Sequence, residues 1–404
     1  MRPLNIAIAG CGPAGLATAL LLHRDGHAVT LFERFDTPRP IGSGLMIQPT
    51  GLAVLRELGL AGPLLDHGAR IARLRGESGA GGRVVLDVRY AALGRRDRFG
   101  VGIHRATLFA LLHAAVTAEG ITIEAGRPIA GTELRSGNQR RLMFENGESA
   151  GPFDLVVDAL GTRTPLAPPC GRALAYGALW GTVDWPDACG FDDAALEQRY
   201  RRASAMVGVM PVGRRVSGDT RQAAFFWSLR ADRLDAWRTA GLDAWKAEVA
   251  ELWPATRPLL DQIVSADLLT FAHYAHRTLA APAQTGMIHL GDAWHSASPQ
   301  LGQGANMALL DAYALAIALR EFADVEDALA HAIALRHKHV RLYQALTALL
   351  TPVYQSDSHL IPFIRDRLVG PISKLWPVPR IQAALVSGLV GGPLGPLRLD
   401  RPPE

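Results

Sequence analysis

The sequence of 404 residues predicts an α/β fold with a parallel sheet, an inserted antiparallel sheet and a helical C-terminal tail. Residues 5–33 follow the order strand, glycine-rich turn, helix and strand, which is typical of a βαβ unit in a parallel sheet. Residues 178–229 contain three strand-like runs rich in aromatic and aliphatic side chains, as expected of an antiparallel sheet. Helical periodicity dominates the end of the chain, where we expect helices over 327–348, 356–368 and 380–389.

Composition and charge narrow the classes of function. The net charge of +4 is small, and the arginines are scattered, so nucleic-acid binding is not expected. Cys11, Cys170 and Cys189 lack metal-ligand or redox spacing, which favours a reducing cytoplasm and no metal site. No uninterrupted apolar run of about 20 residues is present, so no transmembrane segment is expected.

The first thirty-five residues predict a dinucleotide-binding site. Gly10 permits a tight turn, Gly12 lets the backbone approach a diphosphate, and Gly15 lets the helix pack closely on the strands. The positive end of that helix can then hold phosphate oxygens. Glu33 ends the second strand, where a carboxylate can accept hydrogen bonds from both ribose hydroxyls, and this motif alone fits FAD or NAD. The predicted contacts are Gly10, Gly12, Pro13, Ala14, Gly15, Glu33 and Arg34.

A second motif follows the strand-like run 287–290. Asp292 would lie at the carboxyl end of this strand, where a carboxylate can bind a polyol such as a ribityl chain. The turn 302–304 lets backbone lie against a flat ring, and the helix after it would point its positive end at that ring. The predicted cofactor contacts in this block are Asp292, Gly302, Gln303, Gly304, Ala305 and Asn306.

The two motifs together resemble those of the class A flavoprotein monooxygenases, of the para-hydroxybenzoate hydroxylase and ubiquinone-hydroxylase type. The block 291–306 matches the second FAD motif of that family almost position for position, so the resemblance implies FAD. Weaker matches add Gly44 and Arg105 as candidate FAD contacts, although Arg105 also suits a plain helix start on the surface. The resemblance places Pro299 beside the oxygen site; His295 would order this loop or transfer a proton.

The resemblance implies an activity as well. NADH or NADPH would bind transiently and reduce FAD, and O2 would form a flavin C4a-hydroperoxide that hydroxylates or epoxidises a small apolar or aromatic substrate. One position departs from the family: Leu160 replaces the Asp of the third motif, and Asp158 lies on the same side of the strand as a candidate substitute. Two alternatives therefore stay open, a dehydrogenase or reductase without oxygen insertion and a non-catalytic flavin-binding or redox-sensing protein.

The resemblance also divides the chain into parts. The substrate domain is expected to lie over the flavin, and Met210, Phe225 and Trp227 are its predicted pocket residues. Alternation along the strands leaves open which face of the sheet looks at the flavin. For the C-terminal segment three roles stay open: a cover on the substrate domain, a homodimer face or a contact with a membrane surface. The expected boundaries are 1–71, 100–169 and 281–324 for the FAD-binding domain, 72–99 and 170–280 for the substrate domain, and 325–404 for the C-terminal segment.

Overall fold

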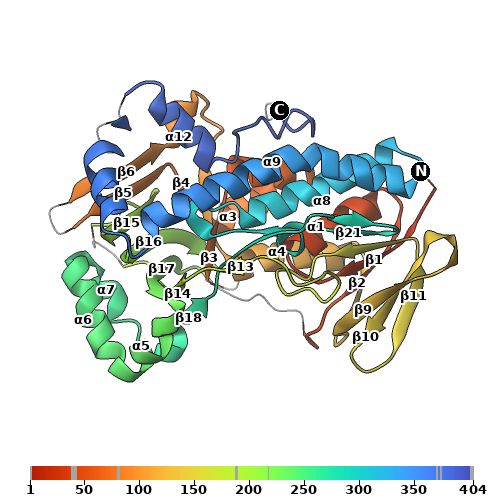
Figure 1. Ribbon diagram of the computed structural model, residues 1–404, viewed down its shortest axis with the longest axis horizontal. Coiled ribbons are helices and arrows are strands. Elements are labelled where there is room, and N and C mark those ends of the chain that lie inside the picture. Colours follow the sequence, from red (N-terminus) through yellow and green to blue (C-terminus); the bar gives the residue numbers. More distant parts are fainter. Residues whose placement is uncertain are drawn as a thin grey trace.

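The computed structural model of the protein describes residues 2–37, 43–79, 82–186, 190–216, 218–369, 372–373 and 375–400. Two sheets with their helices lie along the long axis of the molecule, and a long helix from the C-terminal segment runs over both (Figure 1). Among the cysteines, Cys11 is buried and Cys170 is exposed, whereas Cys189 lies outside the described residues.

The first sheet is the parallel sheet that the βαβ unit predicts. Its strands follow the order β20-β21-β12-β1-β2-β8, and only β20 pairs antiparallel with its neighbour. β1 and β12 are almost wholly buried, as expected of short apolar runs covered on both faces. The strands are β1 (Asn5–Ala9), β2 (Ala28–Phe32), β8 (Thr122–Glu124), β12 (Leu155–Asp158), β20 (Ala283–Gln284) and β21 (Met287–His289).

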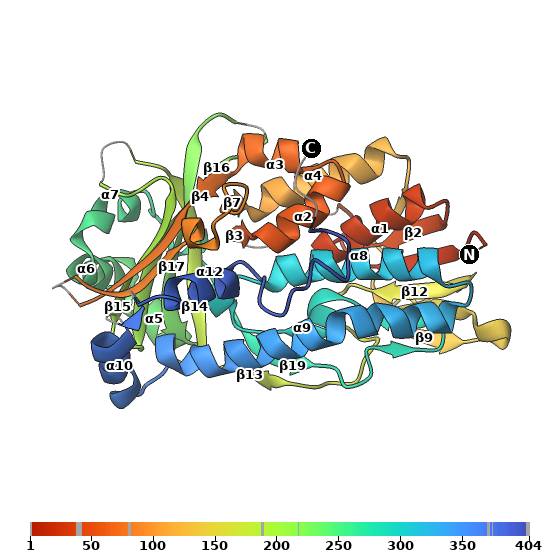
Figure 2. The same cartoon turned by 90° about the horizontal axis from the view of Figure 1, so that it is seen from above.

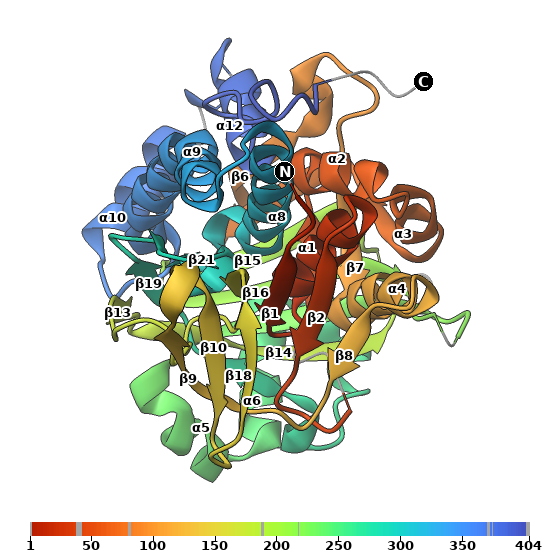
Figure 3. The same ribbon diagram turned by 90° about the vertical axis from the view of Figure 1, so that its right-hand side faces the viewer.

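Helices cover one face of this sheet and a three-stranded meander covers the other (Figure 3). Ile6 and Ile8 enter the core on the helix side, whereas Ala7 and Ala9 meet the meander, because side chains alternate along β1. Because β1, β12 and β21 run parallel, the carboxyl ends of β1 and β21 lie at the same edge of the sheet, where sheets of this kind bind ligands. The covering elements are α1 (Pro13–Arg24), α4 (Arg105–Ala118), α8 (Gly304–Glu321), β9 (Ile129–Leu134), η2 (Ser136–Asn138), β10 (Arg140–Phe144) and β11 (Ser149–Phe153).

A small sheet of order β3-β7-β4 joins the two halves of the molecule. It packs against strand β16 of the second large sheet, and α2 at its other side packs on α8. Its elements and their neighbours are β3 (Gly44–Ile47), α2 (Pro49–Glu57), α3 (Ala61–His67), β4 (Ala69–Ile71), η1 (Tyr90–Leu93) and β7 (Gly100–His104).

The second large sheet has seven strands in the order β18-β14-β17-β16-β15-β5-β6. All neighbours are antiparallel except β15 and β5, which run parallel. The strand-like run 84–88, which belongs to the part expected to form the substrate domain, lies in β6 at the edge of this sheet. The strands are β5 (Arg73–Ser78), β6 (Arg83–Arg89), β14 (Tyr176–Asp184), β15 (Ala195–Arg201), β16 (Ala205–Arg214), β17 (Arg221–Arg230) and β18 (Thr270–Ala272).

Short helices cover the outer face of the seven-stranded sheet. One amphipathic helix is expected over 234–252, but the structure has two, because Gly241 adopts a φ of 86° and ends the first of them. The helices and turns here are η3 (Ala231–Arg233), α5 (Leu234–Ala240), α6 (Leu242–Leu252), η4 (Pro254–Thr256), α7 (Arg257–Leu260) and η5 (Ala266–Leu268). A further small sheet comprises β13 (Arg172–Ala173), β19 (Ala275–Thr278) and β22 (His295–Ser296).

The two faces of the seven-stranded sheet carry different side chains, and this corrects the prediction for Phe225 and Trp227. Both pack in the outer core with Trp245 of α6, so they do not line the inner face. The inner face, which packs on β3 and β7, carries Met210 together with Phe226. Strand alternation alone does not show whether Phe225 and Trp227 or Phe226 face the inner side of the sheet. The structure decides, because α6 covers the face that carries Phe225 and Trp227.

The C-terminal segment is helical, as expected. α9 packs along α8 and then reaches the half of the molecule that holds the seven-stranded sheet (Figure 2). Ala383 and Val386 join Met46 and Met210 in one core, so this segment covers the inner side of the sheet next to β3. The elements are α9 (Val325–Tyr354), α10 (Leu360–Ile364), the π-helical turn η8 (Arg365–Val369) and α12 (Val378–Val386).

Candidate active site

The turn between β1 and α1 has the geometry of a diphosphate cradle. Gly10 has a φ of 101°, and a Cβ on Gly15 would lie 1.9 Å from the carbonyl oxygen of Gly10, so both positions require glycine. A Cβ on Gly12 would meet no atom within 4 Å, which leaves open space beside the start of α1. Gly12 is the N-cap and Pro13 opens the helix, and no side chain caps this end. An incoming phosphate can therefore accept hydrogen bonds from the first turn, around Ala14.

Glu33 lies at the end of β2, beside this turn. Its Oε2 accepts a hydrogen bond from the backbone N–H of Cys11 at 3.1 Å, and its Oε1 accepts one from Phe35 at 3.2 Å. These two contacts fix the carboxylate, and each oxygen keeps a lone pair for a ribose hydroxyl. Arg34, the neighbouring candidate, is exposed and stacks its guanidinium 4.6 Å from the centre of the Phe35 ring.

The second motif is organised around the buried carboxylate of Asp311 on α8. Its Oδ2 accepts hydrogen bonds from the backbone N–H of Gly291 at 3.0 Å and from Nε2 of His295 at 2.7 Å. Its Oδ1 accepts one from Nε of Arg336 at 2.8 Å. Burial alone would raise the pKa of Asp311, but the charges of His295 and Arg336 outweigh it, and the pKa falls below its usual value. His295 thereby orders the loop, since the nitrogen that faces Asp311 is already engaged.

Gln303 and Asn306 direct their side chains into the protein. Asn306 accepts a hydrogen bond from the backbone of Gln48 and donates to the carbonyls of Met46 and Gly302. Gln303 donates to the carbonyl of Val386 at 2.6 Å. Both side chains therefore shape the turn, and what remains for a flat ring is the backbone of 302–304.

Four predicted site residues keep open surface at the edge of this loop: Asp292, Pro299, Gly304 and Arg105. A Cβ on Gly304 would meet nothing within 4 Å, and no side chain caps the start of α8. Partial loss of water around its carboxylate raises the pKa of Asp292, and the charges of His295 and Arg105 offset part of the rise. Ala305 is half-buried in the first turn of α8. An open turn, an uncapped helix start and a carboxylate at a strand end fit the ring and ribityl chain of a flavin.

Gly44 has a different neighbour from the predicted one. A Cβ at this position would lie 2.5 Å from Cβ of Ala224 and 2.7 Å from Val212, both in the seven-stranded sheet. The adjacent Ser43 hydroxyl donates to the carbonyl of Gly181 at 2.9 Å. The absence of a side chain at Gly44 therefore serves the close approach of β3 to that sheet, and a contact of its backbone with FAD stays a prediction.

Asp158 stabilises the loop of the third motif, in which Leu160 replaces the Asp of the family. Its Oδ1 accepts a hydrogen bond from the backbone N–H of Leu160, and its Oδ2 accepts one from the hydroxyl of Thr164 at 2.7 Å. The ring of His289 lies 2.6 Å from the same oxygen, and both side chains are fully buried. Asp158 thus holds the 160–164 loop from inside the protein, with none of its surface open to a ligand.

Three aromatic side chains that the sequence did not single out meet on the inner face of the seven-stranded sheet. The rings of Trp180 and Phe226 lie 4.6 Å apart, and Nε1 of Trp180 donates to the hydroxyl of Tyr274 at 2.8 Å. Trp180 and Tyr274 are half-buried. Burial raises the pKa of Tyr274 to about 12, so its hydroxyl keeps its proton at neutral pH and can donate a hydrogen bond.

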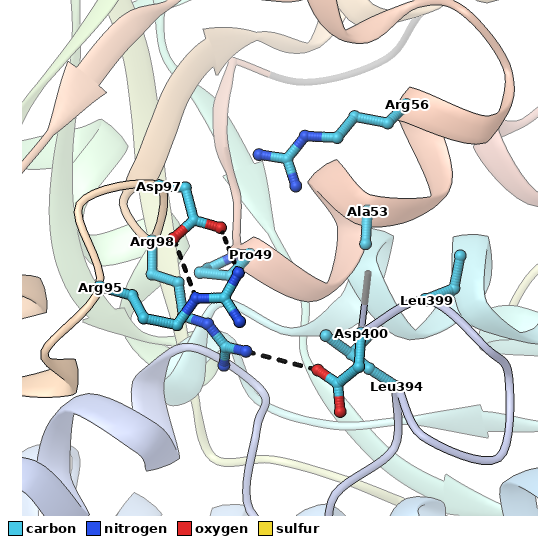
Figure 4. Close-up of a pocket in the computed structure, with 9 residues that line it drawn as sticks. All are labelled: Pro49, Ala53, Arg56, Arg95, Asp97, Arg98, Leu394, Leu399 and Asp400. Atoms are coloured by element: carbon cyan, nitrogen blue, oxygen red, sulfur yellow. Dashed lines mark hydrogen bonds and ion pairs between the residues drawn. The ribbon is translucent and has the colours of Figure 1, made fainter. Parts of the chain in front are cut away.

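A separate pocket lies between α2, the segment before β7 and the chain end (Figure 4). Arg95 pairs with Asp97, and Arg98 reaches Asp400 of the C-terminal segment. Its interior of about 20 Å³ has room for about one water molecule, so it is too small for a cofactor. In the part of the chain that the structure describes, no three His, Cys, Asp or Glu side chains gather as metal ligands would. Over the same residues, no helix is both long and apolar enough to cross a membrane.

The comparisons with known proteins agree with this geometry. The FAD binding domain family matches residues 4–139 and 184–341. The 3-amino-4-hydroxybenzoate 2-monooxygenase of Streptomyces cremeus is 30% identical over 327 residues, 77% of each chain. The FAD-dependent urate hydroxylase of Mycolicibacterium vanbaalenii is 24% identical over 98% of each chain. The crystal structure of Klebsiella pneumoniae HpxO with FAD and uric acid has a TM-score of 0.79 at 20% identity, covering 97% of this chain and 98% of that one.

Fold and site together define an FAD-dependent oxidoreductase. The chain belongs to the FAD binding domain family of class A flavoprotein monooxygenases, and it is an FAD-dependent monooxygenase. The family, the fold class and the cofactor expected from the sequence are confirmed. The alternatives of a reductase without oxygen insertion and of a non-catalytic flavoprotein are not favoured, because the relatives are monooxygenases.

Removal of the charge on Glu33 tests the adenosine side of the site. We expect Glu33→Gln to weaken FAD binding about 10- to 100-fold, the usual effect of losing hydrogen bonds to a charged group. FMN, which lacks the adenosine, should bind the variant as it binds the wild type. Quenching of flavin fluorescence on titration of the apoprotein measures both. Equal losses for FAD and FMN would contradict the assigned role.

A second prediction concerns pH. Burial, with the charges of Arg215 and Arg105, lowers the pKa of His104 to about 4, and its Nδ1 accepts a hydrogen bond from the backbone N–H of Ala106. As the pH falls, His104 binds a proton near pH 6.5 in the unfolded chain but only near pH 4 in the folded chain. The contribution of His104 to the free energy of unfolding is therefore fully present above pH 6.5 and is lost as the pH falls towards 4.

His104→Asn removes the titration but keeps a residue type suited to start α4. Between pH 4 and 6.5, the free energy of unfolding of the FAD-loaded variant should rise less steeply with pH than that of the wild type, by the slope that corresponds to about one bound proton. Urea unfolding at several pH values measures the slope. An unchanged slope would show that His104 is protonated in the folded protein.

Proposed function

We propose that this protein uses NAD(P)H and O2 to hydroxylate a small aromatic or heterocyclic ring compound held between the turn at Gly302 and the aromatic side chains of the inner face. The observation that carries the proposal is the trio Trp180, Phe226 and Tyr274, which lies on the face of the sheet that packs on β3. Two related proteins are named for ring compounds, a hydroxybenzoate and urate. This agrees with the apolar or aromatic substrate expected from the sequence.

The trio suits a planar ring that carries a polar group. The half-buried Trp180 offers an aromatic face, and Phe226 supports it from behind at 4.6 Å between ring centres. The hydroxyl of Tyr274 accepts from Trp180, so its own hydrogen is free to bind an acceptor atom on the ligand. Met210 and Ala224 lie on the same face but are buried against β3 and β7, so they support the trio without lining the proposed pocket. This arrangement replaces the lining by Phe225 and Trp227 that the sequence suggested.

FAD, when bound, supplies electron transfer and oxygen activation, and the chain supplies the surroundings. Glu33 and the turn at Gly12 would hold the adenosine and diphosphate, and Asp292 the ribityl chain. The uncapped start of α8 would direct its positive end to the ring edge and stabilise negative charge there. Asp311 keeps that loop in place, and the exposed Pro299 would border the oxygen side of the site.

The remaining partners stay predictions. The sequence has one dinucleotide fingerprint, so NADH or NADPH is expected to bind transiently and leave. Because Asp158 holds the 160–164 loop from inside, we infer that this loop keeps its shape without the Asp that Leu160 replaces. A homodimer and a location in the cytoplasm are proposed from the sequence alone.

The experiment that tests the function follows an oxygen atom. The FAD-loaded protein is reduced with NADH or NADPH without oxygen, in the presence of a panel of hydroxybenzoates, quinolones and purines, and labelled O2 is then admitted. We expect faster flavin bleaching with at least one ring compound and one labelled oxygen atom in its product, detected by mass spectrometry. Bleaching with only hydrogen peroxide as product, across the panel, would contradict the proposal.

A matched pair of variants tests the proposed lining. Phe226→Leu should raise the KM of the ring substrate found in that panel about 10-fold, since Trp180 loses the aromatic ring that supports it from behind. Phe225→Leu, one residue away on the outer face beneath Trp245, should leave KM unchanged and lower the stability by roughly 1 kcal/mol. NAD(P)H oxidation assays and urea unfolding separate the two effects. Equal KM changes would show that the inner face does not bind the substrate.

A further inference from the structure

The C-terminal segment carries an unusual concentration of exposed apolar side chains. Seven of the thirteen large hydrophobic side chains exposed in the described residues come from positions 360–381. Trp376 is 84% exposed and Leu375 62%. Single exposed apolar side chains are normal on a protein surface, but a dense group marks an interaction site. We call this group the apolar edge: Leu360, Phe363, Ile364, Ile372, Leu375, Trp376 and Ile381.

The segment is amphipathic across its folded structure. η8 and α12 both pack against β6, so their outward sides face away from the same strand. The inward side chains Pro362, Ala383 and Val386 are buried. The inner sides of α10, η8 and α12 are therefore already packed against the protein, and the apolar edge is their exposed outer side.

The unpaired charges around the apolar edge are positive, since the exposed carboxylate of Asp357 is already bonded to Arg230 and Tyr176. Arg202, Arg367 and Arg380 are exposed, and the guanidinium of Arg367 lies 4.1 Å from the centre of the Phe363 ring. The acid nearest in the chain, Asp366, is half-buried and already bonded to the hydroxyl of Ser78 and to Arg365. A partner that covers this face must therefore offer apolar groups together with negative charge.

We propose that the apolar edge docks on an anionic lipid surface, with the apolar side chains entering the interfacial layer and the arginines meeting the headgroups. Exposed Trp, Leu and Phe beside Arg is the composition of segments that lie in a membrane interface without spanning it. Arginines near an anionic leaflet add an electrostatic attraction that salt weakens.

A second copy of this chain fits the same face less well. A twofold contact brings identical patches together, so Arg367 and Arg380 of one copy would face those of the other. The only acid between residues 358 and 399 is Asp366, which is engaged within its own chain. Lipid phosphates supply the missing negative charge.

The C-terminal segment that carries the apolar edge also lies next to the candidate active site. Tyr354 packs on Tyr200 in the cluster that contains Phe226, and Val386 shares a cluster with Met210, so the inner side of the C-terminal segment belongs to the same cores as the proposed substrate face. A ring compound dissolved in the membrane could then exchange with the proposed substrate face from the docked side. Docking itself is independent of the proposed function, because it is measured without turnover.

The test is co-sedimentation of the FAD-loaded protein with vesicles of phosphatidylcholine alone or mixed with phosphatidylglycerol. We expect binding to the mixed vesicles that weakens with salt, and a blue shift of tryptophan emission from Trp376. Leu360→Ser/Leu375→Ser should weaken binding about 10-fold or more, from the loss of buried apolar area. The matched control Val264→Ser/Leu268→Ser, with 78% and 52% exposed side chains on the substrate domain, should bind as the wild type does.

Arg367→Gln/Arg380→Gln should remove the preference for the mixed vesicles. Absence of binding to both vesicle types would overturn the proposal, as would equal binding by the wild type and the Leu360/Leu375 variant. Sedimentation equilibrium without lipid supplies a further check: a dimer that this variant makes monomeric would identify a second copy as the occupant and overturn the lipid assignment. None of these measurements depends on turnover, so the docking proposal and the hydroxylase proposal can each be contradicted independently of the other.

Discussion

The carboxylate of Asp311 is the constraint on which the cofactor site depends. It is buried at the centre of four elements and binds the backbone after β21, the ring that opens β22 and the guanidinium of Arg336 on α9. A buried charge of this kind is costly unless every partner is present, so the loop and both helices must assemble in one arrangement. The uncapped start of α8 and the open backbone at Gly304 are consequences of that arrangement, because no side chain of the loop turns back to fill them.

A second constraint sets the distance between the two halves of the molecule. Gly44 and Gly102 bring β3 and β7 against the seven-stranded sheet, where a Cβ on Gly102 would lie 2.1 Å from the carbonyl oxygen of Pro211. Asn306 ties β3 to the start of α8 through Gln48 and Met46. The turn at Gly302 and the inner face of the seven-stranded sheet are therefore both positioned by their packing on β3. A change in β3 packing would alter the spacing between these two proposed binding surfaces.

Much of this architecture could be predicted from the sequence, because glycine spacing and strand-end acids have few alternative explanations in a βαβ unit. Gly10, Gly15 and Glu33 are examples in which local chemistry alone fixes the geometry. The face occupied by Phe225 and Phe226 could not be predicted, since a period of two gives the same pattern whichever side α6 covers. The inward direction of Gln303 and Asn306 was equally hidden, because their partners, Val386 and Met46, lie far away in the chain.

The C-terminal segment connects the outside of the protein to the flavin turn by a short series of contacts. Gln303 binds the carbonyl of Val386, and His339, next to the Asp311 network, binds the carbonyl of Gly388 at 3.0 Å. A Cβ on Gly388 would lie 2.7 Å from Oε1 of Gln303, so α12 cannot shift far along this surface without disturbing the turn. The end of α12 and the backbone at 302–304 are therefore connected directly through the side chain of Gln303. The amide of Gln303 also donates to the carbonyl of Leu301 at 3.2 Å, so one buried side chain links the end of α12 to the turn at 301–304.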